Sequence, residues 1–260
     1  MTTTPFALKA RLLPWLVPFA IIAGWQVLAS AGIISDRVLP APAEVGTAAV
    51  DLATNGRLLE DIAVSARRAA LGFLIGGTIG FVLGLVNGAI PLSGTLFDSS
   101  MQMLRTIPHL ALIPLVILWF GIGETSRIFL VALGVVFPVY LNTYHGVRNV
   151  DPGLLEMAEN YGVSRTDLFL RVILPGALPS ILVGVRYGLG IMWLTLIVAE
   201  TIAANSGIGY VTMNAREFLQ TDVLVFGILL YALLGKLADV AARALEGRLL
   251  AWNPAYAGAA

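Results

Sequence analysis

The sequence predicts an all-α integral membrane protein with six transmembrane helices, organised as a single transmembrane domain over residues 1–260. Of the 260 residues, 58% are hydrophobic and only 12% are charged, whereas soluble domains carry about 25% charged residues. Six apolar segments follow one another along the chain. At about 1.5 Å of helix per residue, the first of them, residues 12–31, is long enough to cross a hydrocarbon core of about 30 Å.

The same composition argues against several classes of function. The 16 basic and 16 acidic residues cancel, which gives no reason to expect nucleic acid as a partner, and no cysteine is present. His109 and His145 lie far apart in the sequence, so no metal site is predicted. Gly235-Lys236 is followed by Leu237 and lacks the upstream glycine of a phosphate-binding loop. We therefore expect no catalytic site, metal or cofactor on this chain; if ATP is used, a partner subunit binds it.

The first predicted span covers residues 12–31 and follows Lys9 and Arg11. Residues 29–31 look like a signal-peptidase site, but the apolar run is long for a signal peptide and further spans follow. An uncleaved first helix is therefore favoured. Residues 33–61 are predicted to form a loop outside the membrane that holds one short amphipathic helix.

The second predicted span, residues 69–90, carries glycine at every fourth position. These glycines are Gly72, Gly76, Gly80, Gly84 and Gly88. A ridge of small residues lets another helix backbone approach closely. The ridge predicts helix packing and no other role.

Prolines interrupt the third predicted span, residues 103–120. Pro108 and Pro114 are expected to kink or break this helix. A broken helix is tolerated in a membrane only where protein or a water-filled cavity satisfies the freed backbone groups. The segment is therefore either part of a transport pathway or an ordinary kinked helix. The fourth span, residues 128–144, follows and contains Asn142.

A polar segment of about residues 148–176, here called the elbow, separates the fourth and fifth spans. Good helix formers occupy residues 156–159, and Gly162 stands where a C-terminal cap is expected. Ser164 and Asp167 have the spacing of a capping box that opens a second short helix. Two short helices joined at a glycine suit docking into a groove of another protein. The alternative is a plain polar loop.

The fifth predicted span, residues 177–203, contains Arg186 and ends near Glu200. A charge within a span is costly unless it is paired or wetted, and Glu200 lies about 21 Å further along the helix, too far to be its partner. Arg186 is then part of a pathway for an anion, a structural ion pair, or a side chain that extends to the membrane edge. Further candidates for this pathway are Arg105, His109, Asn142 and Glu200.

A polar connection over residues 205–222, with a short helix at about 213–219, leads to the sixth predicted span, residues 223–245. Six spans place both termini on the same side of the membrane. Assigning that side as cytoplasmic puts more Lys and Arg inside than outside, which favours this orientation. It also places the elbow in the cytoplasm.

The elbow resembles the cytoplasmic EAA signature of ABC importer permeases, which reads E-A-A, three residues, G, nine residues, I-x-L-P. Met157 stands in place of the first alanine and Val172 in place of the isoleucine, and both remain apolar. The residues matched to this coupling loop are Glu156, Met157, Ala158, Gly162, Leu174 and Pro175.

The resemblance covers nearly the whole chain. Residues 39–45, 103–124 and 137–158 resemble the nitrate, sulfonate and taurine group of these permeases. Residues 192–210, 214–222 and 231–240 resemble the alkanesulfonate importer permeases within that group.

This resemblance implies the ABC type I importer permease fold, with the elbow as a cytoplasmic coupling helix. It implies a homodimer among the lipids of a bacterial inner membrane, with both termini cytoplasmic. Two ATP-binding cassette subunits would bind ATP and Mg²⁺, and a periplasmic sulfonate-binding protein would deliver the substrate. The implied cargo is an aliphatic sulfonate, with taurine, nitrate or another small organic anion as the alternative. A stand-alone secondary transporter or channel is a less favoured alternative, because the two halves of the sequence show no clear internal repeat.

Overall fold

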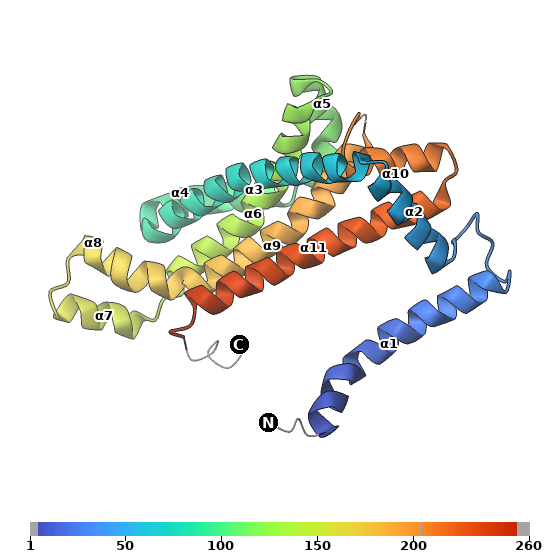
Figure 1. The fold of residues 1–260 in the computed structure, drawn as a ribbon. Coiled ribbons are helices and arrows are strands. Elements are labelled where there is room, and N and C mark those ends of the chain that lie inside the picture. The colour runs from blue at the N-terminus through green and yellow to red at the C-terminus, as the bar shows by residue number, and fades with distance from the viewer. Residues whose placement is uncertain (1–4, 203, 254–260) are drawn as a thin grey trace.

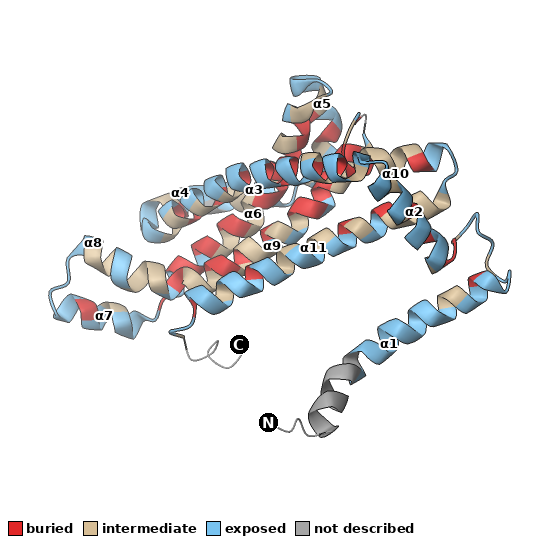
Figure 2. Cartoon of the chain, viewed as in Figure 1, coloured by how far each residue is buried: buried red, intermediate tan, exposed pale blue. Residues whose placement is uncertain are grey.

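The computed structural model describes residues 5–202 and 204–253, and over these residues the secondary structure is helical. Three helices form the centre: α3 (Arg57–Ala89), α6 (Glu124–Arg148) and α9 (Leu174–Thr201). α11 (Thr221–Leu249) runs beside α9 (Figure 1). Figure 2 shows buried residues where these helices meet, and exposed residues along most of the described part of α1 (Pro5–Ser30).

Four described helical segments are long and apolar enough to cross a membrane: α3, α6, α11 and the continuous helix over Arg165–Thr201. A bent pair of helices would make a fifth span, and the apolar part of α1, Trp15–Ser30, is shorter than these. Lys9 and Arg11, which precede the first predicted span, are among the residues whose side chains the structure does not describe. The prediction of an all-helical membrane protein is confirmed, and the count of six spans stays a prediction.

The glycine ridge of α3 lies against α6. A Cβ added at Gly76 would clash with the backbone of Ala132, and one at Gly80 with the carbonyl of Val136. Gly72, Gly84 and Gly88 face α6 in the same way. The helix backbones approach so closely here that any side chain on this face would push them apart.

The third predicted span is broken. α4 (Pro91–Arg105) is followed by a 3₁₀ turn, His109–Leu112, and by α5 (Ile113–Phe120). The axis turns by 77° between Ser99–Arg105 and His109–Phe120. Pro108 lies at this break, as predicted. Pro114 does not interrupt a helix: it lies in the first turn of α5, where a proline costs no hydrogen bond.

Several predicted boundaries are corrected. α3 begins at Arg57, well before residue 69, because its polar first turns pack against other elements. The helix expected at 213–219 is α10 (Ile208–Glu217), whose start is held by side chains of α3 and α9. The short helix opened by Ser164 is not separate. α8 (Arg165–Leu168) continues through a π-helical turn, Phe169–Ile173, into α9.

The loop between the first two spans contains the predicted short helix, α2 (Pro42–Thr54). Two hydrogen bonds join the end of α1 to α2 and to the segment just before it. Trp25 Nε1 donates to Pro40 O at 3.0 Å, and Ala43 N donates to Gln26 Oε1 at 3.1 Å. α1 begins and α11 ends toward the end of the bundle that carries α7 and α8, whereas α2 and α10 lie at the opposite end (Figure 1).

Candidate functional site

The elbow projects beyond the bundle as α7 (Pro152–Asn160) followed by α8 (Figure 1). The turn between them has a left-handed residue, Gly162, with φ 69°. Gly162 N donates to Glu159 O at 2.9 Å and Val163 N to Ala158 O at 3.1 Å. This pair of bonds is a Schellman motif, which ends α7 through its own backbone.

The start of α8 is capped as the capping-box spacing predicts. Ser164 Oγ accepts a hydrogen bond from Asp167 N at 3.2 Å and donates one to Asp167 Oδ2 at 2.7 Å. Arg171 Nε lies 2.9 Å from Asp167 Oδ1, one turn further along. The shape of the elbow therefore depends on local contacts between neighbours in the sequence.

The outer face of α7 exposes apolar side chains beside an acidic one. Glu156 is exposed, and Met157 and Tyr161 beside it are 53% and 82% exposed. Together with Asn160 they line a shallow hollow. Ala158 points inward and is buried, so the exposed tip is acidic and apolar. Such a surface fits contact with another protein.

Leu174 and Pro175 connect the elbow to the bundle. Both are half-buried at the start of α9. Leu174 packs against a core cluster formed by Val147, Ala177 and Ile181. The elbow is therefore continuous with α9 and is packed against α6.

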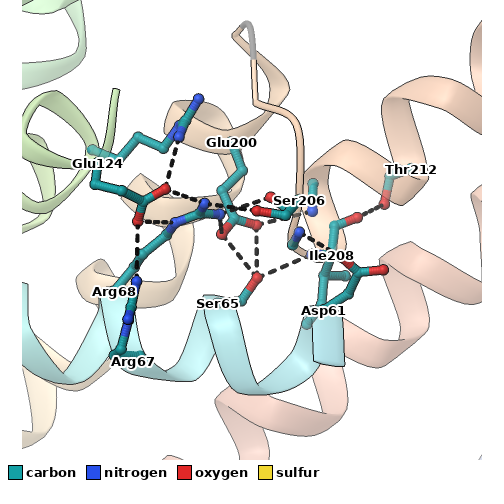
Figure 3. Close-up of polar contacts among 12 residues, drawn as sticks. Asp61, Ser65, Arg67, Arg68, Glu124, Glu200, Ser206, Ile208 and Thr212 are labelled. Carbon is teal, nitrogen blue, oxygen red and sulfur yellow. Dashed lines mark hydrogen bonds and ion pairs between the residues drawn. The ribbon is translucent and has the colours of Figure 1, made fainter. Parts of the chain in front are cut away.

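At the opposite end of the bundle the structure has a buried polar network (Figure 3). Arg68 of α3 is 1% exposed and connects Glu200 of α9 with Glu124 of α6. Its Nη1 donates to Glu200 Oε1 at 2.7 Å, and its Nε donates to Glu124 Oε2 at 2.8 Å. Nη2 also donates to Glu124, and Arg127 Nη1 donates to the same carboxylate at 3.1 Å. This network joins three helices at one point.

The network also holds the start of α10. Gly207 N donates to Asp61 Oδ1 at 2.7 Å, Ile208 N to Ser65 Oγ at 3.0 Å, and Gly209 N to Glu200 Oε2 at 2.9 Å. These are N–H groups that a helix N-terminus leaves without partners, and carboxylates are favoured there. Asp61, Ser65 and Glu200 thus position α10 against α3 and α9.

Arg186 has ion-pair partners on α11. Its Nε lies 2.8 Å from Asp239 Oδ1, and its Nη1 lies 3.7 Å from Glu246 Oε2. Lys236 Nζ and Arg243 Nε each lie 3.1 Å from Asp239 Oδ2. Arg186 therefore belongs to a charged cluster between α9 and α11.

The other pathway candidates lie apart from this cluster. Arg105 is exposed at the end of α4, and His109 Nε2 lies 3.0 Å from Thr195 Oγ1 of α9. Asn142 is bound within the bundle, since its Nδ2 donates to Pro138 O at 2.8 Å. Glu200 is 1% exposed and takes part in the network around Arg68, so it has almost no surface for a substrate. The structure does not gather these residues with Arg186 into one site.

Residues 68–251 match the protein family described as the binding-protein-dependent transport system inner membrane component. The chain belongs to this family. The match runs from Arg68, within α3, to just past the end of α11, and it confirms the resemblance of the elbow and its flanking segments to the importer permeases. Members of this family are transport subunits. Among the described residues, no group of three or more His, Asp or Glu side chains is placed to hold a metal ion.

Similar proteins support the same family. The chain is 62% identical to the putative aliphatic sulfonates transport permease protein SsuC of Escherichia coli, over 95% of this chain and 94% of that protein. It is 46% identical to the protein of the same description in Bacillus subtilis, over 94% and 88%. A crystal structure of an amino acid ABC transporter with histidines matches with a TM-score of 0.58 at 17% identity, covering 75% of this chain and 96% of that chain. That likeness shows the fold of the permease.

Sequence reasoning missed the network around Arg68. Arg68 and Glu200 are separated by 132 residues, and Arg68 looks like a flanking charge just before the apolar run. The one available signal was that Glu200 ends an apolar span without a nearby cation. Its partner could be identified only in three dimensions.

Proposed function

We propose that this permease is the membrane subunit of an ATP-driven importer for aliphatic sulfonates. The observation that carries the proposal is the 62% identity to SsuC over nearly the full length of both chains. The chain itself would bind neither ATP nor Mg²⁺. Two ATP-binding cassette subunits would supply that chemistry from the cytoplasm, and a periplasmic binding protein would deliver the sulfonate.

We further propose six spans in one domain, with both termini and the elbow in the cytoplasm. In this arrangement α1 and the bent pair of α4 and α5 supply the two spans beyond the four long helices. Two copies would form the pathway as a homodimer. The separation of α1 from its own bundle supports this (Figure 1), because an exposed apolar helix fits a neighbouring chain or lipid.

The elbow is the proposed coupling helix, with Glu156 and Met157 at the contact with the ATPase and Gly162 setting the turn. Because α8 continues into α9 without a break, a push on the elbow would move α9 directly. Coupling of this kind needs two conformations whose equilibrium both ATP and substrate shift. The elbow would select between inward-open and outward-open arrangements of the helices.

The function is tested by reconstituting the permease with its ATPase and binding protein in liposomes. We expect ATP-dependent uptake of ethanesulfonate or hexanesulfonate and two copies of each membrane-complex subunit by native mass spectrometry. Uptake of taurine or nitrate in preference to these alkanesulfonates would replace the proposed cargo. Purification without any ATPase would contradict the importer assignment.

Gly162→Val is expected to uncouple ATP hydrolysis from transport. A residue with a Cβ in the left-handed region costs about 1–2 kcal/mol, and valine resists it most. An added Cβ at Gly162 meets no atom within 4 Å, so the effect is conformational and not a clash. Gly162→Asn is the matched control because asparagine tolerates this conformation. We expect the Asn variant to transport and the Val variant to lose transport. Equal transport by both would remove the turn from the coupling mechanism.

A further inference from the structure

The helix that joins the elbow to the bundle contains a π-helical turn, Phe169–Ile173, between α8 and α9. Leu174 N donates to Phe169 O, five residues earlier, instead of to the carbonyl four residues earlier that an α-helix uses. Such turns are rare, and they are frequent at functional sites. The residues that follow the turn supply a physical cause for it.

Pro175 is that cause. A proline has no backbone N–H, and inside an α-helix its ring clashes with the carbonyl four residues earlier, here that of Arg171. A π turn holds about one residue more than an α turn, which moves this carbonyl away from the ring. Pro179 removes a second donor, the one that the Pro175 carbonyl would use. Two backbone donors are thus absent just after the π turn, and helices bend at prolines and at π turns.

Packing against α6 begins where the π turn ends. Ala177 is fully buried, and an added Cβ at Gly146 of α6 would meet Ala177 O at 2.9 Å. Ser180 Oγ donates to Asn142 O of α6 at 2.7 Å. α9 is therefore held on α6 from Ala177 onward.

The chain before and within the π turn is more open. Arg165 of α8 is exposed, and so are Leu170 and Arg171 in the turn itself. α7 and α8 project beyond the bundle (Figure 1). The π turn therefore lies at the boundary between a helix that is packed in the bundle and an elbow that extends from it.

We propose that the π turn is a joint, which lets the elbow change its angle to α9 while the elbow stays seated on the ATP-binding subunit. The proposal rests on the proposed function, in which the elbow contacts that subunit and moves α9. A stiff connection would force the elbow out of its groove when α9 tilts between the inward-open and outward-open arrangements. A joint transmits displacement along the helix and absorbs the change in angle.

The hydrogen bonds of the turn allow such bending. If the π turn continued, residue 175 would donate to Leu170 O, but Pro175 has no N–H. Leu174 N can therefore move from Phe169 O to Leu170 O without displacing a donor from residue 175. One hydrogen bond replaces another, so the amide of Leu174 stays paired as the joint bends.

The first test removes the joint without turning the elbow. Because a π turn holds about one residue more than an α turn, deleting Leu170 lets the segment form an α-helix whose two flanks keep their relative orientation. The deletion is combined with Pro175→Ala, which restores the missing N–H. The control carries Leu170→Ala and Pro179→Ala. It removes the same side chain and one proline of the same helix, but it keeps the π turn and Pro175.

We expect the straightened variant to assemble with its ATPase and to lose sulfonate uptake by about 10-fold, within the usual range of coupling between sites. The control should stay within about twofold of wild type, because its joint is intact. Wild-type uptake by the straightened variant would overturn the proposal, because a rigid helix would then couple as well as a jointed one.

The second test measures the joint in the unmodified helix. The chain has no cysteine, so two introduced cysteines can carry spin labels whose separation is measured by electron paramagnetic resonance. Leu154→Cys on α7 and Tyr187→Cys on α9 lie on either side of the π turn, and both side chains are exposed. Leu59→Cys and Val82→Cys form the control pair on α3, a single helix without proline.

In the complex with the ATPase, we expect ATP binding to shift the Leu154–Tyr187 separation and to leave the Leu59–Val82 separation unchanged. An unchanged Leu154–Tyr187 separation, or equal shifts in both pairs, would overturn the joint even if the straightened variant failed to assemble. A shift in an importer that takes up no sulfonate would remove the proposed cargo and retain the joint. Sulfonate uptake without a shift would remove the joint alone.

Discussion

Arg68→Met is expected to lower the free energy of unfolding by about 3–5 kcal/mol, the cost of breaking a buried ion pair by removing one partner. Arg68 is 1% exposed, and its loss would leave Glu200 buried without its cation. Ser65, Tyr231 and Gly209 would still donate to Glu200, but none of them carries a charge. The start of α10 would loosen at the same time, because it is held by the same carboxylate.

The measurement is the thermal unfolding midpoint of the detergent-solubilised permease, monitored by size-exclusion chromatography of heated samples. Arg67→Met is the matched control. Arg67 is the preceding residue on α3, is 66% exposed, and lies 3.8 Å from Glu124. Exposed pairs of this kind contribute about 0–1 kcal/mol. Equal midpoints for the two variants would show that the buried network does not stabilise the bundle.

Gly76→Val is expected to disrupt the contact between α3 and α6. The new Cβ would overlap the backbone of Ala132, which cannot rotate away as a side chain can. Forcing extra carbon atoms into a packed interface costs about 1–3 kcal/mol, and occasionally more. We expect the upper end of this range or beyond, because the helices themselves must separate.

Gly77→Val is the control for this substitution. At Gly77 an added Cβ has Phe73 as its nearest neighbour, at 3.8 Å, which is ordinary contact. Both variants replace a glycine of α3 by the same β-branched residue, so the difference between them isolates packing from helix propensity. Yield of monodisperse protein and the unfolding midpoint are measured for both. If Gly76→Val matched Gly77→Val, the glycine ridge would have no role in packing.

The elbow was predictable because its contacts are local. α7 ends through bonds from Gly162 to the residue three positions earlier and from Val163 to the residue five positions earlier, and Ser164 caps α8 through Asp167. Helix caps depend on residue types at fixed short spacing, which a sequence displays directly. The continuation of α8 into α9 was not predictable in this way. The capping box marks only where α8 starts. The π-helical turn at Phe169–Ile173 joins α8 to α9, so the helix does not end where the sequence predicts.

By itself, the sequence determined the all-helical membrane class, the glycine ridge, the break at Pro108 and the membership of the permease family. The first three follow from composition, period or spacing within a short window, and the family follows from the resemblance of long segments to known permeases. Only the tertiary structure decided that Arg68 pairs with Glu200 and that Arg186 pairs with Asp239. The physical reason is that a charge in an apolar span requires a partner, but the requirement does not specify which one. That choice depends on which helices pack together and in which rotation, and those are properties of the whole bundle.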